Sequence, residues 1–185
     1  TRPDVLPDDV VDYLAEINQR TYLIVELGLQ TIHDETGKRI NRHHTYQDFL
    51  EGYEKLHQKG IPVCAHIIDG LPGESHQDML ETAQALSQLD LHCIKIHLLH
   101  VLKHTVMAEQ YQNGEFPLLR LEEYVQIICD QLEVLPPELI IQRLTGDGAK
   151  EDLIGPLWSL KKFVVLNEID KELVRRDSWQ GKYYQ

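Results

Sequence analysis

The chain alternates between two hydrophobic periods. Apolar residues three and four positions apart indicate helices that begin near residues 8, 45, 75 and 121. Short apolar runs at 22–29, 61–68, 92–99 and 139–144 lie between or beside these helices and predict buried strands. Strand and helix recur at a spacing of roughly 30 residues, and this order predicts a parallel sheet built from βαβ units.

Two helix starts carry a cap signal. Thr45 is followed three residues later by Asp48, and Ser75 is followed in the same way by Asp78. Each pair resembles a capping box, in which the two residues satisfy backbone groups that the first helical turn leaves free. Both pairs directly precede an apolar helical face, so they fix where two of the helices should begin.

Three stretches are less regular. Residues 30–44 are polar and rich in His and Arg, which predicts a loop with room for a short helix. Residues 100–120 show no clear period and are expected to be irregular. Pro156 suits the first turn of a last, long helix that reaches about Arg175.

The ends of the four expected strands share one property. They are polar or rich in glycine, while the strand interiors are apolar: Gln30, the turn 70–74, residues 100–105 and residues 145–148. Ligands of parallel α/β folds bind at the carboxyl ends of the strands. The sequence therefore favours a shared cleft there, with plain surface turns as the alternative.

Charge and cysteine content narrow the class of protein. The 18 basic and 30 acidic residues give a formal charge of −12, which disfavours a general phosphate-binding surface. Cys64, Cys93 and Cys129 are widely spaced and form no CxxC pair, so a disulfide scaffold and a zinc ribbon are both disfavoured. No apolar run approaches the roughly 20 residues of a membrane helix. We expect a cytoplasmic protein.

Some charged residues stand in unusual places. Glu26 lies inside an apolar strand, and a buried carboxylate needs a partner, either an arginine or a ligand. His97, His100 and His104 have spacings that suit a metal, but they straddle a strand end and a loop. Hydrogen-bonded or surface histidines are the favoured interpretation, and no metal ligand is assigned within this chain.

Three segments together resemble the radical S-adenosylmethionine (SAM) superfamily. They are residues 25–31 (Val-Glu-Leu-Gly-Leu-Gln-Thr), 41–45 (Asn-Arg-His-His-Thr) and 66–74 (His-Ile-Ile-Asp-Gly-Leu-Pro-Gly-Glu). Their order is similar to the branch that contains the Elongator catalytic subunit and the oxygen-independent coproporphyrinogen oxidases. Within it, the chain most resembles a bacterial group of YhcC/YtqA type.

The resemblance implies a partial (β/α) barrel whose first strand leads to a CxxxCxxC loop. That loop holds a 4Fe–4S cluster, and the reduced cluster splits SAM to give a 5′-deoxyadenosyl radical. The chain has no CxxxCxxC. We therefore expect a barrel truncated at its amino-terminal side, inactive by itself, with residues 1–148 as its later part and 149–185 as a helical extension packed on it.

The resemblance also implies a set of SAM-contacting positions: Glu26, Gln30, Arg42, His66, Ile68 and Gly70. Gln30 matches a polar position near the ribose or methionine moiety, and His66 matches a position near the ribose where relatives use an acidic residue. Arg42 resembles an arginine that approaches the methionine carboxylate, for which a guanidinium fork is suited. Ile68 and Gly70 match a strand that borders adenine. Glu26 either braces Arg42 or binds ligand.

Substrate and partners follow from the same resemblance. It implies transfer RNA, modified at wobble uridine, and an electron donor such as flavodoxin or ferredoxin. Substrate-side candidates are His100, Lys103, Arg143 and Asp147. The alternatives are a small, porphyrin-like metabolite and a non-enzymatic adenosine-binding module; a basic groove at Lys103, Arg143, Lys161 and Lys162 would favour RNA. No membrane association is expected, and an exposed sheet edge would allow dimers.

Overall fold

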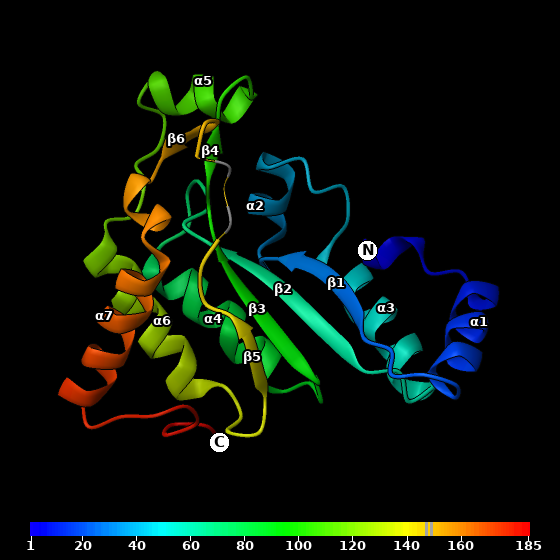
Figure 1. Cartoon of the computed structure of the whole chain (residues 1–185). Coiled ribbons are helices and arrows are strands. Elements are labelled where there is room, and N and C mark those ends of the chain that lie inside the picture. Colours follow the sequence, from blue (N-terminus) through cyan, green and yellow to red (C-terminus); the bar gives the residue numbers. More distant parts are fainter. Residues whose placement is uncertain (147, 149) are drawn as a thin grey trace.

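A four-stranded parallel sheet forms the centre of the protein, in a computed structural model that describes residues 1–146, 148 and 150–185. The strand order is β1-β2-β3-β5, with β1 at Val25–Gln30, β2 at Val63–Asp69, β3 at Cys93–Leu98 and β5 at Ile140–Arg143. All three neighbouring pairs are parallel (Figure 1). The predicted α/β class and its four strands are confirmed.

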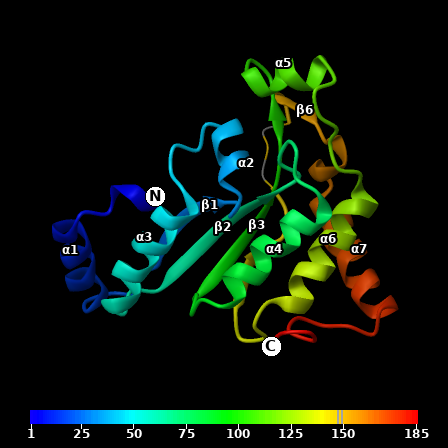
Figure 2. The same cartoon turned by 180° about the vertical axis from the view of Figure 1, so that it is seen from behind.

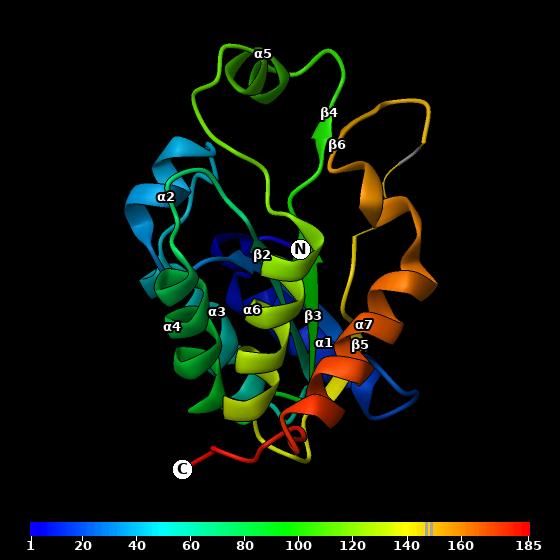
Figure 3. The same cartoon turned by 90° about the vertical axis from the view of Figure 1, so that its left-hand side faces the viewer.

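Helices cover one face of this sheet and leave the other open. Figure 2 shows α3, α4 and α6 in front of the strands, and Figure 3 shows α7 beside α6. The longer helices are α1 (Asp8–Asn18), α3 (Tyr46–Gln58), α4 (His76–Ser87), α6 (Leu121–Val134) and α7 (Lys162–Arg175). In the described part of the chain, no helix has the length and apolar character needed to span a membrane.

The strands are apolar toward the helices and polar toward the open face. Leu27, Leu29, Ile67 and Ile96 are at most 1% exposed and join the main core with side chains of α3, α4 and α6. Their neighbours along each strand point to the opposite side, because side chains alternate along a strand. Glu26 is exposed there, and His66, Lys95 and His97 are half-buried.

Both predicted capping boxes are present. Thr45 Oγ1 accepts from the backbone N–H of Asp48, whose carboxylate accepts from the backbone N–H of Thr45 at 2.6 Å. Ser75 and Asp78 make the same reciprocal pair at the start of α4. The local sequence therefore sets the start of α3 and α4 independently of tertiary packing.

The stretch 100–120, predicted to be irregular, contains regular structure. The strand β4 (Val101–Leu102) pairs antiparallel with β6 (Leu153–Gly155), and α5 (Val106–Gln112) follows β4. The partners in this small sheet are about fifty residues apart, so no local period reveals it. The short helix allowed within 30–44 is present as α2 (Asp34–Arg39).

The last helix begins later than predicted. Pro156 precedes a short 3-10 helix (Leu157–Leu160), and α7 starts only at Lys162. The backbone of Lys161, at φ −99° and ψ 61°, separates the two. Val165 and Ile169 on α7 are buried in the main core. The division of the chain at residue 148 stays a prediction.

Candidate functional site

A pocket of about 400 Å³ lies at the carboxyl ends of β1, β2 and β3. Three of the six positions predicted to contact SAM, Gln30, Arg42 and Ile68, line it together. The other lining residues are Thr1, Arg2, Gly28, Ile40, His44, Leu71, Leu99 and Met107. Apolar side chains from separate elements thus meet polar ones at the edge where parallel α/β folds bind ligands.

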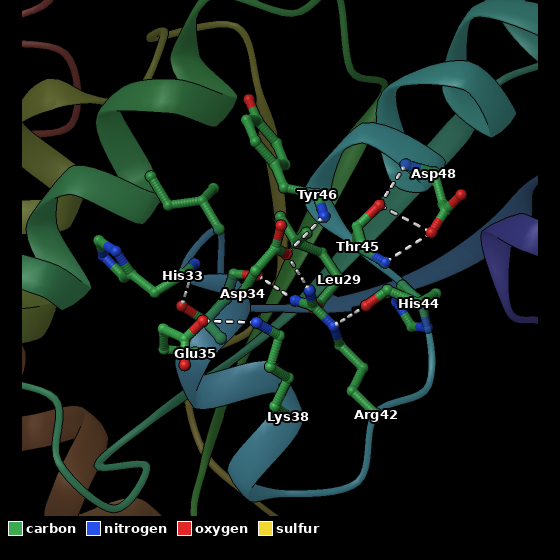
Figure 4. Close-up of polar contacts among 12 residues, drawn as sticks. Leu29, His33, Asp34, Glu35, Lys38, Arg42, His44, Thr45, Tyr46 and Asp48 are labelled. Atoms are coloured by element: carbon green, nitrogen blue, oxygen red, sulfur yellow. Dashed lines mark hydrogen bonds and ion pairs between the residues drawn. The ribbon is translucent and has the colours of Figure 1, made fainter.

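The Arg42 guanidinium is buried in the wall of this pocket, with its side chain only 2% exposed (Figure 4). Its Nε donates to His44 O at 2.8 Å, and Nη1 donates to the carbonyl oxygens of Leu29, at 2.9 Å, and Thr31. Its Nη2 donates to Asp34 Oδ1 at 2.7 Å. Arg42 therefore joins the end of β1, the start of α2 and the loop before α3.

These contacts give Arg42 a structural role that its sequence position did not indicate. An arginine carries five N–H donors, and four of its bonds already go to protein oxygens. Asp34 balances its charge. Binding of a ligand carboxylate by Arg42 stays a prediction, and the geometry leaves one N–H for it.

The loop that Arg42 holds has an unusual backbone. Gln30, Asn41 and His43 have φ values of 66°, 53° and 64°, in the left-handed region that residues other than glycine seldom adopt. Arg42 bonds the carbonyls on both sides of Gln30. The ion-paired arginine thus fixes a strained turn at the pocket edge, and such strain persists only where surrounding contacts impose it.

His44 supplies the pocket with a buried polar atom. Its Nε2 lies 2.9 Å from Gly28 O, while Nδ1 is sealed from solvent and has no partner among the described residues. Burial lowers the pKa of His44, with Arg42 acting in the same direction, so the ring is neutral. When Nε2–H donates to Gly28 O, Nδ1 is left as a buried acceptor without a partner among the described residues.

The pocket fits a ligand with one apolar part and one polar part. Ile40, Ile68, Leu71, Leu99 and Met107 provide the apolar surface, and Thr1, Arg2 and Gln30 provide polar groups. Adenosine within SAM has both features. The described residues around the pocket are therefore compatible with SAM.

Gly70 does not line this pocket. Its φ of 82° serves the turn after β2, and a Cβ there would come within 3.0 Å of Leu119. Its backbone N–H faces Met79 Sδ at 3.1 Å. The structure thus assigns Gly70 to the tight β2–α4 connection, and a contact with adenine stays a prediction.

Glu26 is not the partner of Arg42, which corrects one of the two expectations for it. Its Oε1 accepts from Lys95 Nζ at 2.6 Å, and its Oε2 lies 2.7 Å from His66 Nε2. The carboxylate is 44% exposed on the open face of the sheet, because the strand is buried on one side only. His66 in turn lies against His97, a residue that sequence reasoning had considered only for a metal site.

The substrate-side candidates lie apart from one another. His100 is half-buried beneath the backbone of Gly146 and Gly148, and Lys103 donates to Glu151 O beside the β4–β6 sheet. Arg143 ends β5 and helps to lower the pKa of His97. Asp147 lies outside the described residues. Arg143 is therefore the candidate that the structure connects to the open face.

The three cysteines do not lie together in the fold. Cys64 and Cys93 are opposite each other on β2 and β3, whereas Cys129 lies on α6 with its Sγ 3.8 Å from Ile169 O. All three are buried, and burial raises the pKa of each thiol. Low-pKa, accessible thiols are the ones that ligate metals readily, and that the cluster ligands lie outside this chain stays a prediction.

One other group of side chains has metal-ligand spacing. In the part of the chain that the structure describes, ligand atoms of His33, Asp78 and Glu81 lie within 4.8 Å of one another. His33 Nε2 already bonds Asp78 O at 3.0 Å, and Asp78 also caps α4. These contacts account for the group without an ion.

A parallel sheet that is open on one face, with a ligand-sized pocket at the carboxyl ends of its strands, defines the protein as a β/α half-barrel of the cofactor-binding kind. The chain belongs to the radical SAM superfamily. The model described as "Radical SAM superfamily" matches residues 1–86, and the model described as "Radical_SAM C-terminal domain" matches residues 91–175.

Individual relatives agree with this family. The chain is 57% identical over its whole length to the uncharacterized protein YtqA of Bacillus subtilis and spans 58% of that protein. It is 26% identical to the tRNA uridine(34) acetyltransferase of Methanocaldococcus infernus, over 85% of this chain and 31% of that protein. The structure of M. infernus Elp3 aligns with a TM-score of 0.80 and 23% identity, covering 93% of this chain and 41% of Elp3. The radical SAM resemblance and its barrel fold are confirmed.

Proposed function

We propose that the complete protein is a radical SAM enzyme that modifies transfer RNA at wobble uridine. The observation that carries this is the 400 Å³ pocket at the ends of β1–β3, in a chain of the radical SAM superfamily. When bound, SAM and a reduced 4Fe–4S cluster supply reductive SAM cleavage and hydrogen abstraction. The transfer RNA part is supported by the name of one relative and by the fold of Elp3.

The residues of this chain would bind and orient SAM. Ile68, Leu71 and Leu99 would pack on the adenine and exclude water from it. Gln30 would offer its amide at the end of β1. Arg42 would keep this end of the pocket in shape through its backbone bonds.

Pocket filling tests the SAM site. In the full-length protein, Ile68→Trp should block the apolar surface and weaken SAM binding by at least tenfold in calorimetry. Ile140→Trp is the matched control, because Ile140 is 48% exposed on β5 and does not line this pocket. Equal SAM affinity in both variants would place the SAM site elsewhere.

Nucleoside analysis tests the substrate. Deleting the gene should change the mass-spectrometric profile of modified uridines at position 34, and the intact gene should restore it. Purified full-length protein, assayed without oxygen and with a chemical reductant, should produce 5′-deoxyadenosine. Cleavage of SAM with an unchanged transfer RNA profile would reject transfer RNA while retaining the radical SAM activity.

A further inference from the structure

A layer of polar side chains lies directly beneath the pocket on the open face of the sheet. Glu26 on β1, His66 on β2 and His97 on β3 each stand two residues before a pocket-lining residue. Those residues are Gly28 on β1, Ile68 on β2, and Leu99 directly after β3. Residues two apart share a face and are separated by roughly 7 Å. The layer therefore lies on the same face as the pocket, two residues nearer the amino-terminal ends of the strands.

The members of this layer contact one another across three strands. Lys95 Nζ donates to Glu26 Oε1 at 2.6 Å, and Glu26 Oε2 lies 2.7 Å from His66 Nε2. That second contact has the distance of an ion pair and not the geometry of a hydrogen bond, so His66 Nε2 has no hydrogen-bond partner among the described residues, and the nearby carboxylate acts on it through its charge. His66 Nδ1 lies 3.2 Å from His97 Nε2, with ring centroids 5.1 Å apart.

The charges in this layer follow from the contacts. The hydrogen bond from Lys95 lowers the pKa of Glu26, which stays an anion at neutral pH. Burial lowers the pKa of His66. Burial, together with His66, Arg143 and Lys95, lowers the pKa of His97 to about 4, against a smaller opposite effect of Glu26. Both rings are therefore neutral at pH 7.

The Glu26 carboxylate favours one combination of tautomers for the neutral rings of His66 and His97. The Glu26 carboxylate has no proton to donate, so His66 presents Nε2–H to it and keeps a lone pair on Nδ1. His97 must then direct Nε2–H to His66 Nδ1. This leaves Nδ1 of His97 unprotonated, an acceptor that the carboxylate fixes from two residues away.

We propose that Glu26 and His66 are positioning residues that hold His97 as a hydrogen-bond acceptor for an N–H or O–H group of the RNA substrate. This rests on the function proposed above. His97 does not line the pocket that would hold SAM, so we assign the donor to the substrate and not to SAM. A neutral acceptor selects a protonated nucleobase nitrogen or a hydroxyl over an acceptor group.

The tautomers are measured directly by two-bond nitrogen–proton NMR of the full-length protein, labelled with ¹⁵N only in histidine. At pH 7, His66 and His97 should both show protonated Nε2 and unprotonated Nδ1. In Glu26→Gln, Lys95 keeps the amide oxygen as its acceptor, so the amide N–H faces His66 Nε2 and both rings should shift toward the tautomer protonated at Nδ1. Glu81→Gln is the matched control, since Glu81 stands 3.8 Å from another histidine, His33.

In the wild-type protein, a His97 ring protonated at Nδ1 would overturn the proposed order of contacts from Glu26 through His66 to His97. Tautomers that do not change in Glu26→Gln would overturn it as well. Signals are assigned with His66→Phe and His97→Phe, whose spectra also report whether each variant is folded. This measurement does not depend on any enzymatic activity. Its result therefore stands even when transfer RNA proves not to be the substrate.

Kinetics identify the source of the donor. With transfer RNA from the deletion strain as the probe, His97→Phe should raise KM for RNA about tenfold, as expected for one lost hydrogen bond. His97→Asn places an oxygen near the former Nδ1 and should restore most of the loss. The Kd for SAM should stay within twofold in both variants. A fall in SAM affinity with an unchanged KM for RNA would assign the acceptor to SAM and overturn the proposal.

Discussion

The guanidinium of Arg42 lies against the backbone of Gly37 in α2. A Cβ at position 37 would come within 2.8 Å of Arg42 Cζ and Nη2, and the backbone N–H of Arg42 bonds Gly37 O at 2.9 Å. Glycine inside a helix costs about 1 kcal/mol relative to alanine. Glycine at position 37 leaves room for the Arg42 guanidinium, which a side chain there would contact too closely.

Gly37→Ala should therefore destabilise the protein despite its better helix propensity. The guanidinium is held by four hydrogen bonds and cannot move aside freely. We expect a loss of about 1–3 kcal/mol, typical of an overpacked site, in urea unfolding. Lys38→Ala, on the exposed side of the same helix, should change stability by less than about 0.5 kcal/mol. A more stable Gly37→Ala variant would contradict this packing.

Arg42→Lys should lower stability although it keeps the charge. An ammonium group cannot reach the carbonyls of Leu29, Thr31 and His44 in the geometry of a fork, so buried acceptors lose their partners. We expect a loss of about 2–4 kcal/mol. Asp34→Asn should cost less, because the Asp34 side chain is 43% exposed and water replaces the lost contact. Equal losses would mean that the ion pair, and not the backbone bonds, carries the stability.

His100 and Gly146 form a second close contact of this kind. A Cβ on Gly146 would come within 2.6 Å of His100 Cε1. Gly146→Ala alone should cost about 1–3 kcal/mol, and His100→Ala should remove the clash. In a double-mutant cycle measured by thermal unfolding, the cost of Gly146→Ala should therefore fall to near zero when His100 is alanine. Additive costs would show that the loop does not rest on the imidazole.

The sequence predicted most of what depends on local pattern. The four parallel strands and both capping boxes follow from hydrophobic periods and cap residues. The predicted cleft is confirmed in part, because Gln30 and Leu71 line the pocket and residues 100–105 and 145–148 do not. The β4–β6 pair was missed because its partners are far apart along the chain. The start of α7 was misplaced because Pro156 also suits the turn that precedes the 3-10 helix.

The site was predictable in composition but not in contacts. Gln30, Arg42 and Ile68 meet at one pocket, as strand ends of a parallel sheet should. Whether Arg42 faces a ligand or the backbone depends on the path of the loop, which no motif encodes. Glu26 meets Lys95 and not Arg42, because cross-strand register decides its neighbours. The sequence signal for the contacts among Glu26, His66 and His97 was that each is a polar residue inside an otherwise apolar strand.

Asp69 should make stability depend on pH. It is 1% exposed at the end of β2, where Oδ1 accepts from Gln131 Nε2 at 2.8 Å. Its Oδ2 and Gln131 Oε1 are both buried and have no hydrogen-bond partner among the described residues. Burial raises the pKa of Asp69 to about 7, with Gln131 opposing the rise. The protonated carboxyl is therefore the form that the folded protein favours.

Because the pKa of Asp69 is higher in the folded than in the unfolded protein, the free energy of unfolding should fall as pH rises. The stabilising effect of the bound proton is complete below the unfolded pKa of about 3.9, falls as pH rises toward 7, and is lost above 7. The difference amounts to at most about 4 kcal/mol.

Asp69→Asn keeps the shape, carries no charge and can donate to Gln131, so it should be more stable than the wild type at pH 8 and nearly equal to it at pH 4. Urea unfolding across this range measures the difference, and Asp152→Asn, at an exposed position, serves as the control. Parallel stability curves for Asp69→Asn and the wild type would show that Asp69 does not hold a proton in the folded protein.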